Sequence, residues 1–502
     1  MSPVSKFSSY GKFKTMAMGN TAQNAPTIGT ATDVGTSRAY NNGAATVTFT
    51  APASNGSNFP ITSYTVTSSP GGFTASGAAS PLTVTGLQSS TSYTFTATAT
   101  NAVGTSSASA ASNSITATTV PQVPTIGTAT GGNASATVAY TANATGGKTV
   151  TYTATSSPGS FTGTGASPIT VSGLTNGSSY TFTVVASNAN GSSAASSASN
   201  SVTLAIPTYT VDYLVIAGGG STDGLRNSAS VGLGSSTSGA GAGGYLTGTL
   251  TFVGGTSYGI TIGAGGTGGN SNGSNSVFSS VTSTGGGSTY ATDATGSGAN
   301  SGGSGGGWIS PASPTGAAGT SGQGNAGGGS ASNPGSSAYG GGGGAGGIGG
   351  TGTLTYPSNI WQGGAGGAGG ASSITGTSIG RAGGGGGVGA NGSTGGTQLA
   401  GAGSSGGGTG GSTGGTNTAA VKNGTANTGG GAGGNFGSIA PWSGSTTPGS
   451  LIANGGSGTV IIAYPDSNPA ITTISGGLSY TQPSRSGYRV YQFTGGTGTV
   501  TV

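Results

Sequence analysis

Few side chains in this sequence of 502 residues can carry acid–base or metal chemistry. Histidine, cysteine and glutamate are absent, so the acidic groups are five aspartates that lie far apart in the sequence. General acid–base catalysis needs a titratable group with a tuned pKa, and a nucleophilic triad needs a base beside the nucleophile. Zinc and iron sites need cysteine or histidine, and calcium sites need clustered carboxylates. We therefore predict a protein that is not an enzyme and that has no metal and no cofactor. The aspartates are Asp33, Asp212, Asp223, Asp293 and Asp466.

Aromatic side chains are better suited to a second kind of chemistry, the non-covalent binding of a partner. They lie in the later part of a glycine-rich stretch between Gly218 and Thr459, which holds most of the 114 glycines. Aromatic faces on shallow loops suit sugars or protein loops, because they supply contact area at low entropy cost. The alternative is that each packs against the domain that carries it. The candidate contact residues are Trp308, Tyr339, Tyr356, Trp361, Phe436 and Trp442.

Basic and aromatic side chains also alternate near the N-terminus, in a segment without a strand or helix pattern. Such a segment suits a peptide that orders on docking to an acidic surface. A frayed terminus that only adds solubility is the alternative. The candidate docking residues are Lys6, Phe7, Tyr10, Lys12, Phe13 and Lys14.

The charge distribution argues against nucleic acid and membrane partners. The formal net charge is +5 over 502 residues, with no basic stripe and no arginine-rich run, so nucleic acid binding is not expected. No apolar run approaches the roughly 18 residues that span a bilayer. The first 20 residues lack the apolar core of a signal peptide, so we expect neither membrane insertion nor export by the usual secretory route.

The glycine-rich stretch allows two interpretations. Fixing the backbone of one residue costs about 1–2 kcal/mol, and glycine has no side chain whose burial would offset that cost. One interpretation is therefore a flexible Gly/Ser linker. The other is a polyglycine II bundle: a left-handed extended helix with three residues per turn directs its N–H and C=O groups to its neighbours, and glycine lets those neighbours approach closely. Alanine, serine and asparagine would then mark outward positions or loop tips.

Strand patterns border this stretch on both sides and favour order. An apolar run beginning at Tyr209 predicts a buried strand. Pairing it with the late strands would make the glycine segments excursions from a β frame. Further strands are predicted at 245–253, 258–263, 459–464, 488–494 and 497–502.

Two internal repeats precede this region. The first runs from Pro26 to Thr116 and the second from Pro124 to Thr203, with the same landmarks in order. Apolar residues alternate with threonine or serine in short runs, as in Tyr93 and Phe95, which predicts strands with one buried face. Each repeat is therefore expected to form a β-sandwich of about ninety residues.

Residues 91–104 and 173–191 resemble the later strands of fibronectin type III domains. The resemblance implies that Tyr93 and Tyr180 are corner tyrosines that tie a loop to the sandwich. Where that family usually has tryptophan on the second strand, this sequence has Phe49 and Tyr140. Because a fold alone does not carry function, we expect these domains to act as spacers.

Residues 211–220, 241–248 and 258–266 resemble the glycine-rich domain common in bacteriophage tail fibres and adhesins, and residues 275–279 and 455–462 continue the pattern. The resemblance implies a sandwich of polyglycine II helices whose loop tips carry the receptor contacts. It also makes the aromatic residues listed above candidate receptor contacts, and it makes the N-terminal residues a candidate virion attachment peptide.

Together these observations predict an all-β chain. It would comprise two tandem immunoglobulin-like sandwiches of the fibronectin type III kind and a β-framed glycine-rich domain, holding a polyglycine II bundle if the glycine segments are ordered. The predicted boundaries are 1–24 for the attachment peptide, 25–119 and 120–206 for the sandwiches, and 207–502 for the glycine-rich domain.

The expected function is that of a phage virion structural protein, most simply a tail fibre or appendage that attaches the particle to its host. Its partners would be other virion proteins and a host glycan or outer-membrane protein, and by analogy with fibres it would form a homotrimer. The alternatives are a capsid or tail decoration protein with weak adhesion and a bacterial surface or matrix adhesin. A polysaccharide depolymerase is opposed by the shortage of carboxylates.

Overall fold

The computed structural model shows an all-β chain. It describes residues 23–53, 59–224, 237–290, 298–308, 315–333, 336–356, 358, 360–391, 397–410, 422–434 and 451–502. The described residues form strands, turns and extended segments, and none of their elements is a helix. They therefore include no helix long and apolar enough to cross a membrane. The chain divides into two compact units, residues 1–207 and residues 208–502.

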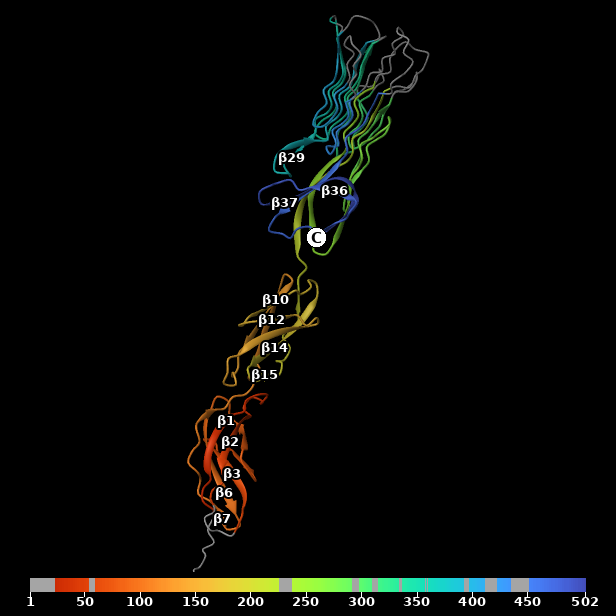
Figure 1. The fold of residues 1–502 in the computed structure, drawn as a ribbon. Coiled ribbons are helices and arrows are strands. Elements are labelled where there is room, and N and C mark those ends of the chain that lie inside the picture. The colour runs from red at the N-terminus through yellow and green to blue at the C-terminus, as the bar shows by residue number, and fades with distance from the viewer. Residues whose placement is uncertain are drawn as a thin grey trace, which may run out of the picture. The chain divides into compact units, whose positions relative to one another are not determined.

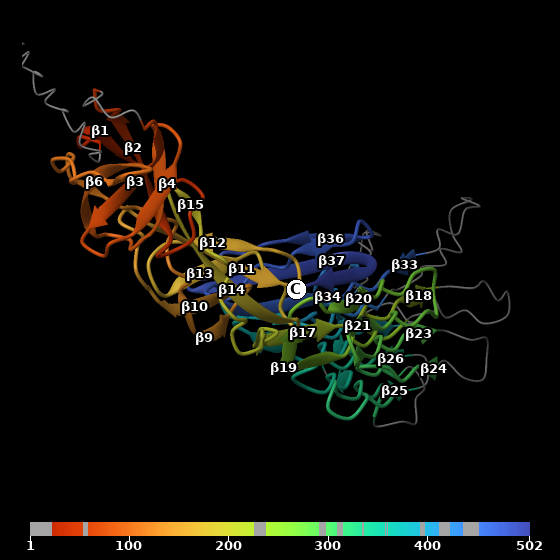
Figure 2. The same ribbon diagram turned by 90° about the horizontal axis from the view of Figure 1, so that it is seen from below.

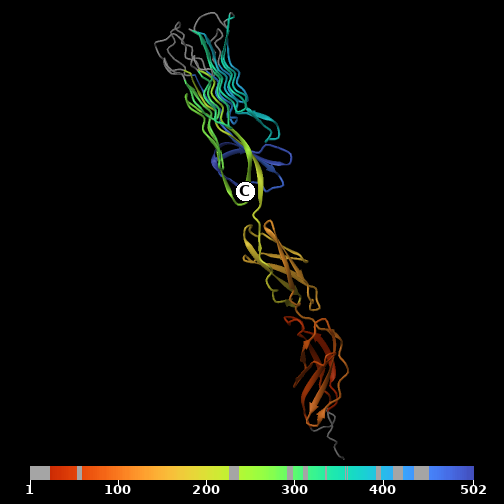
Figure 3. The same cartoon turned by 180° about the vertical axis from the view of Figure 1, so that it is seen from behind.

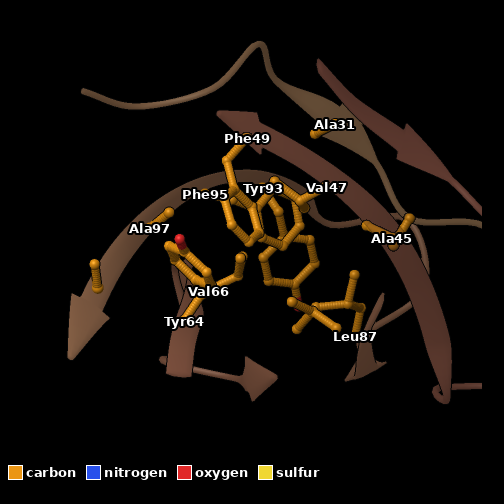
Figure 4. Packing of buried hydrophobic residues seen from close by; sticks show 13 residues of the cluster. Ala31, Ala45, Val47, Phe49, Tyr64, Val66, Leu87, Tyr93, Phe95 and Ala97 are labelled. Carbon is orange, nitrogen blue, oxygen red and sulfur yellow. The ribbon is translucent and has the colours of Figure 1, made fainter. Parts of the chain in front are cut away.

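The first repeat folds as a sandwich of two sheets. One sheet has the order β1-β2-β5 and the other β4-β3-β6-β7, with β8 also paired to β6. The inward side chains of the alternating pattern meet between the sheets, where Val47, Val66 and Phe95 are fully buried (Figure 4). The strands are β1 (Thr27–Asp33), β2 (Gly43–Thr50), β3 (Ile61–Ser69), β4 (Thr74–Gly77), β5 (Leu82–Leu87), β6 (Ser92–Asn101), β7 (Gly104–Thr105) and β8 (Ile115–Thr116).

The second repeat builds the same sandwich. Its sheets have the orders β13-β10-β9 and β12-β11-β14-β15, with β16 also paired to β14. Val138, Val171 and Phe182 lie at the centre of its core. The strands are β9 (Thr125–Gly132), β10 (Ser135–Thr141), β11 (Thr151–Ser157), β12 (Thr162–Thr164), β13 (Ile169–Ser172), β14 (Ser179–Asn188), β15 (Gly191–Ser192) and β16 (Val202–Thr203).

Both corner tyrosines lie as the family resemblance implies. The buried Tyr93 accepts a hydrogen bond at its hydroxyl from the Gln88 N–H at 3.0 Å. The Tyr180 hydroxyl accepts one from the Thr175 N–H at the same distance. Each tyrosine thus fixes the loop that precedes its own strand. The expected substitutes for tryptophan, Phe49 and Tyr140, are both buried in the two cores.

The last segment of each sandwich is not a regular strand. Ser106, Ser109 and Ser112 recur every third residue and pair with every second residue of β6. Each serine N–H donates to a β6 carbonyl, and its hydroxyl accepts the N–H of the same β6 residue, as in the Ala97 N–H to Ser109 Oγ bond at 2.9 Å. Ser193, Ser196 and Ser199 do the same against β14. The serine hydroxyls therefore complete a hydrogen-bond ladder between two segments of different period: every third residue pairs in the serine segment, and every second residue pairs in β6 or β14.

A large sheet frames the glycine-rich unit. Its main order is β19-β17-β34-β37-β20-β21-β22, and β35 and β36 also pair with β37. The first strand of the unit pairs with a late one, β17 with β34, as predicted. The strands are β17 (Thr208–Ile216), β19 (Tyr245–Val253), β20 (Ser257–Thr261), β21 (Ser276–Phe278), β22 (Val281–Ser283), β34 (Thr459–Pro465), β35 (Thr473–Ile474), β36 (Leu478–Thr481) and β37 (Tyr488–Thr501).

The prediction of two separate strands at the C-terminal end is wrong. Residues 488–501 form one strand of 14 residues, β37. Its first half pairs with β34 and its second half with β20. Gly495 and Gly496 lie between the two halves, and Gly496 has a φ of 93°, a conformation that glycine adopts without a steric penalty. The glycine pair lets the strand change partners without ending.

Extended glycine segments run from this frame as a hydrogen-bonded bundle (Figures 1 and 3). Consecutive residues donate their N–H groups to different neighbouring segments, and the same neighbour returns every third residue. Gly239 and Ala242 donate to Gly340 and Gly343, for example, while Gly241 and Gly244 donate to the segment 284–287. Three residues per turn with all bonds made between segments is the pattern of polyglycine II. The described glycine segments are therefore ordered by backbone bonds.

Side-chain size along these segments follows the same period. A methyl group on Gly341, Gly342 or Gly384 would lie closer than 3.0 Å to a backbone oxygen of a neighbouring segment. In the run 363–371, by contrast, every third residue is an alanine, and Ala365, Ala368 and Ala371 are all exposed. In this run glycine occupies the inward positions, because neighbouring backbones lie against them, and alanine occupies the outward ones. Elsewhere the expectation that alanine and serine mark outward positions is wrong, since Ala240, Ala432 and Ser238 are fully buried within the bundle.

Candidate functional site

The candidate site is a pair of small sheets at one end of the glycine bundle, which we call the tip sheets. One has the order β25-β26-β31 and the other β27-β28-β32. Figure 2 labels β25 and β26 together with β18 (Thr222–Gly224), β23 (Thr289–Tyr290), β24 (Gly298–Ala299) and β33 (Leu451–Ala453), a further small sheet, at this end of the unit. The tip strands are β25 (Ala331–Asn333), β26 (Ser336–Ala338), β27 (Thr353–Thr355), β28 (Ile360–Gln362), β31 (Gly389–Asn391) and β32 (Thr397–Leu399).

Glycine segments position the tip strands. Strand β26 continues into the run that begins at Gly340, and β28 continues into the run that begins at Gly363. The Tyr339 N–H donates to the Val388 carbonyl at 2.9 Å, and the Gly364 N–H donates to the Tyr339 carbonyl at 2.8 Å. Backbone bonds from three segments therefore meet at Tyr339, directly below the tip. These bonds join backbone groups, so the side chains of the tip strands are not needed for them and can serve another purpose.

Tyr356 is the most exposed of the predicted contact residues that the structure describes. It directly follows β27, and 61% of its surface is exposed. Leu399, at the end of β32, is also exposed, at 41%. Gln362 pairs with Leu399 across the parallel strands β28 and β32. Tyr356 and Leu399 are thus two exposed apolar side chains at the opposite edge strands of one tip sheet. Sequence reasoning missed Leu399 because it considered aromatic residues alone.

Trp361 does not lie on the tip surface as we expected. It occupies the middle of β28, between Leu354 of β27 and Gln398 of β32, and 6% of its surface is exposed. A ring in that position stabilises the tip sheet and is not available to a receptor. The alternative given for these aromatic residues, that each packs against the domain that carries it, holds for Trp361, because glycine neighbours do not decide which face of a short strand is buried.

Tyr339 and Trp308 take intermediate positions. Both are half-buried at the ends of glycine segments. The Trp308 N–H donates to the Gly328 carbonyl at 3.0 Å, while its indole Nε1 is buried and has no hydrogen-bond partner among the described residues. Phe436 and Trp442 lie outside the described residues. So do the six candidate docking residues, Lys6, Phe7, Tyr10, Lys12, Phe13 and Lys14.

Titratable groups do not gather at the tip sheets. Among the described residues, no group of three or more carboxylates could hold a metal ion. Burial lowers the pKa of Arg381 and raises the pKa of Tyr245, but these two side chains lie near the frame. Arg381 belongs to a hairpin of β29 (Gly370–Ser372) and β30 (Ile379–Arg381). What the tip offers chemically is aromatic and aliphatic contact area held on a hydrogen-bonded scaffold.

Two family models match the sequence. A fibronectin type III domain matches residues 29–115. A glycine-rich domain matches residues 195–465, more than half of the chain. The all-β fold with fibronectin-type sandwiches, predicted from the sequence, is confirmed. No curated protein matches the chain.

Solved structures that resemble the chain contain fibronectin domains. The FN1-FN3 domains of chicken CNTN1 are 16% identical over 45% of this chain and 88% of that chain, with a TM-score of 0.24. A two-domain fibronectin type III segment of chicken tenascin is 16% identical over 36% of this chain and 99% of that chain, with a TM-score of 0.19.

Proposed function

We propose that this chain, which belongs to the glycine-rich domain family, is a phage virion protein that attaches the particle to its host. It acts as a tail fibre or appendage whose tip sheets contact the receptor. The observation that carries this proposal is that, within residues 208–502, the glycine segments form the scaffold and a tip sheet carries exposed side chains. Backbone bonds supply most of the hydrogen bonds between the glycine segments, and Tyr356 and Leu399 are exposed where two of the segments end in a tip sheet. A scaffold that depends so little on side chains leaves the tip sequence open to selection for binding.

Tyr356 is the residue on which we base recognition at the tip. A tyrosine ring buries on the order of 150–250 Å² in a contact. Such anchors at the centre of an interface often cost 2 kcal/mol or more on truncation. Leu399, on the opposite edge strand, is a second exposed apolar side chain of the same sheet. The receptor class that fits is a host glycan or an outer-membrane protein loop.

The remaining parts of the proposal concern assembly. The two sandwiches act as spacers, and the N-terminal residues 1–24 attach the chain to other virion proteins, so that the protein is located on the surface of the virion. The chain acts as a homo-oligomer, for which the resemblance to fibres implies a trimer. The proposal includes no catalysis and no cofactor.

Adsorption competition tests the proposal. Purified residues 207–502 are expected to bind host cells and to block phage attachment when they saturate the cells. The Tyr356→Ala fragment is expected to need at least about tenfold more protein for the same block, because losing about 1.4 kcal/mol weakens binding tenfold. Ser373→Ala, a change in the β29–β30 hairpin near the frame, is the matched control.

Three outcomes separate the alternatives. If the saturating fragment neither binds cells nor blocks attachment, the receptor-binding role fails and a decoration protein is preferred. If antibodies against the chain label bacteria that carry no phage, a bacterial surface or matrix adhesin is preferred. If the fragment shortens a host polysaccharide and an aspartate-to-alanine change abolishes this, the assignment as a non-enzyme is wrong.

A further inference from the structure

Strand β19 forms an unprotected edge of the frame sheet. It pairs with β17 on one side, in a register without interruption from Tyr245 to Val253, and on the other side it pairs with no strand of the described part of the chain. Its nine residues include no charged residue and no proline. Proteins usually protect such edges with lysine, proline or a bulge, because unpaired backbone groups add strands from other chains. This edge has none of those features.

The hydrogen bonds show which backbone groups point outward from the edge. The Tyr245 N–H donates to the Gln323 carbonyl at 3.0 Å, away from β17. At the other end, the Tyr258 hydroxyl donates to the Thr251 carbonyl at 3.2 Å and accepts the Val253 N–H at 2.8 Å. In an extended strand the N–H and C=O groups of alternate residues point to the same side. The odd-numbered residues therefore direct their backbone groups away from β17.

Six outward groups have no hydrogen-bond partner among the described residues. They are the carbonyl of Tyr245, both groups of Thr247, both groups of Thr249 and the N–H of Thr251. The three threonines are exposed. The Tyr245 N–H and the Thr251 carbonyl, by contrast, are occupied. The open part of the edge is thus short, and its limits are set by Gln323 and Tyr258.

This set of free groups is self-complementary about Gly248. In an antiparallel pairing of two β19 strands centred there, Thr247 faces Thr249 of the partner subunit, and Tyr245 faces Thr251 of the partner subunit. The N–H and C=O groups of Thr247 and Thr249 then give four hydrogen bonds between the copies. The Gln323 carbonyl and the Tyr258 hydroxyl lie in front of the Tyr245 N–H and the Thr251 carbonyl, so the pairing ends at the same two places on both copies.

We propose that two copies of this chain pair edge to edge through β19, antiparallel about a two-fold axis at Gly248. The same patch serves on both copies, as a two-fold interface requires. Threonine pairs form on the outer face of the joined sheet, and Leu246 and Leu250, both half-buried in one copy, face each other across the axis on the inner face. A strand of unrelated sequence could also bond to these free edge groups. In a second copy of this chain, however, Gln323 and Tyr258 end the open edge at the same two places, so the two open edges have matching lengths.

The inference does not depend on the attachment role, and it predicts a dimer of the free chain where the resemblance to fibres implied a trimer. The mass of the full chain in solution, measured by sedimentation or light scattering, is expected to be that of two copies. Thr249→Pro is expected to give a monomer, because proline removes an N–H that β17 does not use and proline is tolerated at sheet edges. The double variant Thr247→Lys with Thr249→Lys should also be monomeric, through repulsion between facing lysines.

Thr499→Lys is the matched control, because Thr499 is also exposed but its strand, β37, has partners on both sides. It should remain a dimer. Since the chain has no cysteine, a mixture of Thr247→Cys and Thr249→Cys proteins tests the register: the mixture should form a disulfide-linked dimer more readily than either protein alone. A monomeric or trimeric wild type, edge variants that stay dimeric, or equal cross-linking in all three samples would overturn the proposal.

Discussion

Replacing Gly385 with alanine tests directly whether backbone contact orders the glycine bundle. Gly385 is buried, and its N–H donates to the Ala240 carbonyl at 3.0 Å while its carbonyl accepts the Gly342 N–H at 2.8 Å. An added methyl group would lie against the Ala432 carbonyl, at 2.5 Å from the carbonyl carbon and closer to its oxygen. That oxygen is itself fixed by the Ala240 N–H at 2.9 Å. No flexible side chain is available to move aside.

The cost follows from the bonds that the displacement would break. Relief of the overlap requires one segment to move away from the other, which weakens the two bonds of Gly385 and the bond to Ala432. At about 1 kcal/mol for each buried bond, the loss is roughly 3 kcal/mol, and groups left without partners add to it. Overpacking of a close-packed interior costs about 1–3 kcal/mol by itself. We therefore expect Gly385→Ala to lower the free energy of unfolding of residues 208–502 by about 3 kcal/mol or more.

Tryptophan fluorescence during denaturant unfolding of the full chain measures this loss. All three tryptophans lie after residue 207, so the signal reports on the glycine-rich unit and not on the sandwiches. Gly347→Ala is the matched control, because a methyl group there would lie 3.5 Å from the nearest backbone atom. We expect that variant to unfold within about 0.5 kcal/mol of the wild type, as surface substitutions do. Equal stability of the two variants would refute the reasoning.

Three further predictions address other parts of the chain. Ser109→Ala and Ser196→Ala should each destabilise their own sandwich by about 1–3 kcal/mol in a thermal unfolding experiment, because the Ala97 and Val184 N–H groups lose their acceptors; a change below 0.5 kcal/mol would show that the serine ladder adds no stability. Burial raises the pKa of the phenol of Tyr464. Because the unfolded chain then loses that proton first, the stability of residues 208–502 should fall as pH rises above about 10, and Tyr464→Phe should make the fall shallower; an unchanged slope would contradict this. Trp361→Ala should destabilise the tip sheet by about 3 kcal/mol or more, as large-to-small changes of buried aromatics do; a loss below about 1 kcal/mol would contradict this.

Much of the fold could be predicted because two periods are visible in the sequence. Alternation of apolar and hydroxyl residues located β19 at its observed bounds, and the apolar run after Tyr209 located β17. In the glycine-rich stretch, the helix of three residues per turn was one of two interpretations, and the alanine at every third position of the run 363–371 fits that helix. These patterns are visible because burial acts on the same side of the chain over many residues.

Other features could not be predicted because they depend on what each residue faces. The burial of Trp361 is set by its pairing with Leu354 of β27 and Gln398 of β32. Gln398 lies far from Trp361 in the sequence, and the residues around Leu354 carry no distinctive pattern. The continuity of β37 through Gly495 and Gly496 contradicts the usual meaning of a glycine pair as a break. The exposure of Leu399 follows from a parallel pairing between β28 and β32 that no local signal indicates.

Each glycine segment bonds to the same neighbouring segment at every third residue, and this limits how the glycine bundle can change in length. Inserting one or two residues within a segment would rotate all later residues by one or two thirds of a turn, and buried glycines would exchange places with outward alanines. Inserting three residues keeps every later position on its own side. The turns between segments have no such restriction, since a turn of any length is suitable if the next segment begins with its glycines facing inward. We would therefore expect related chains to differ by multiples of three within their glycine runs and by any number at their turns.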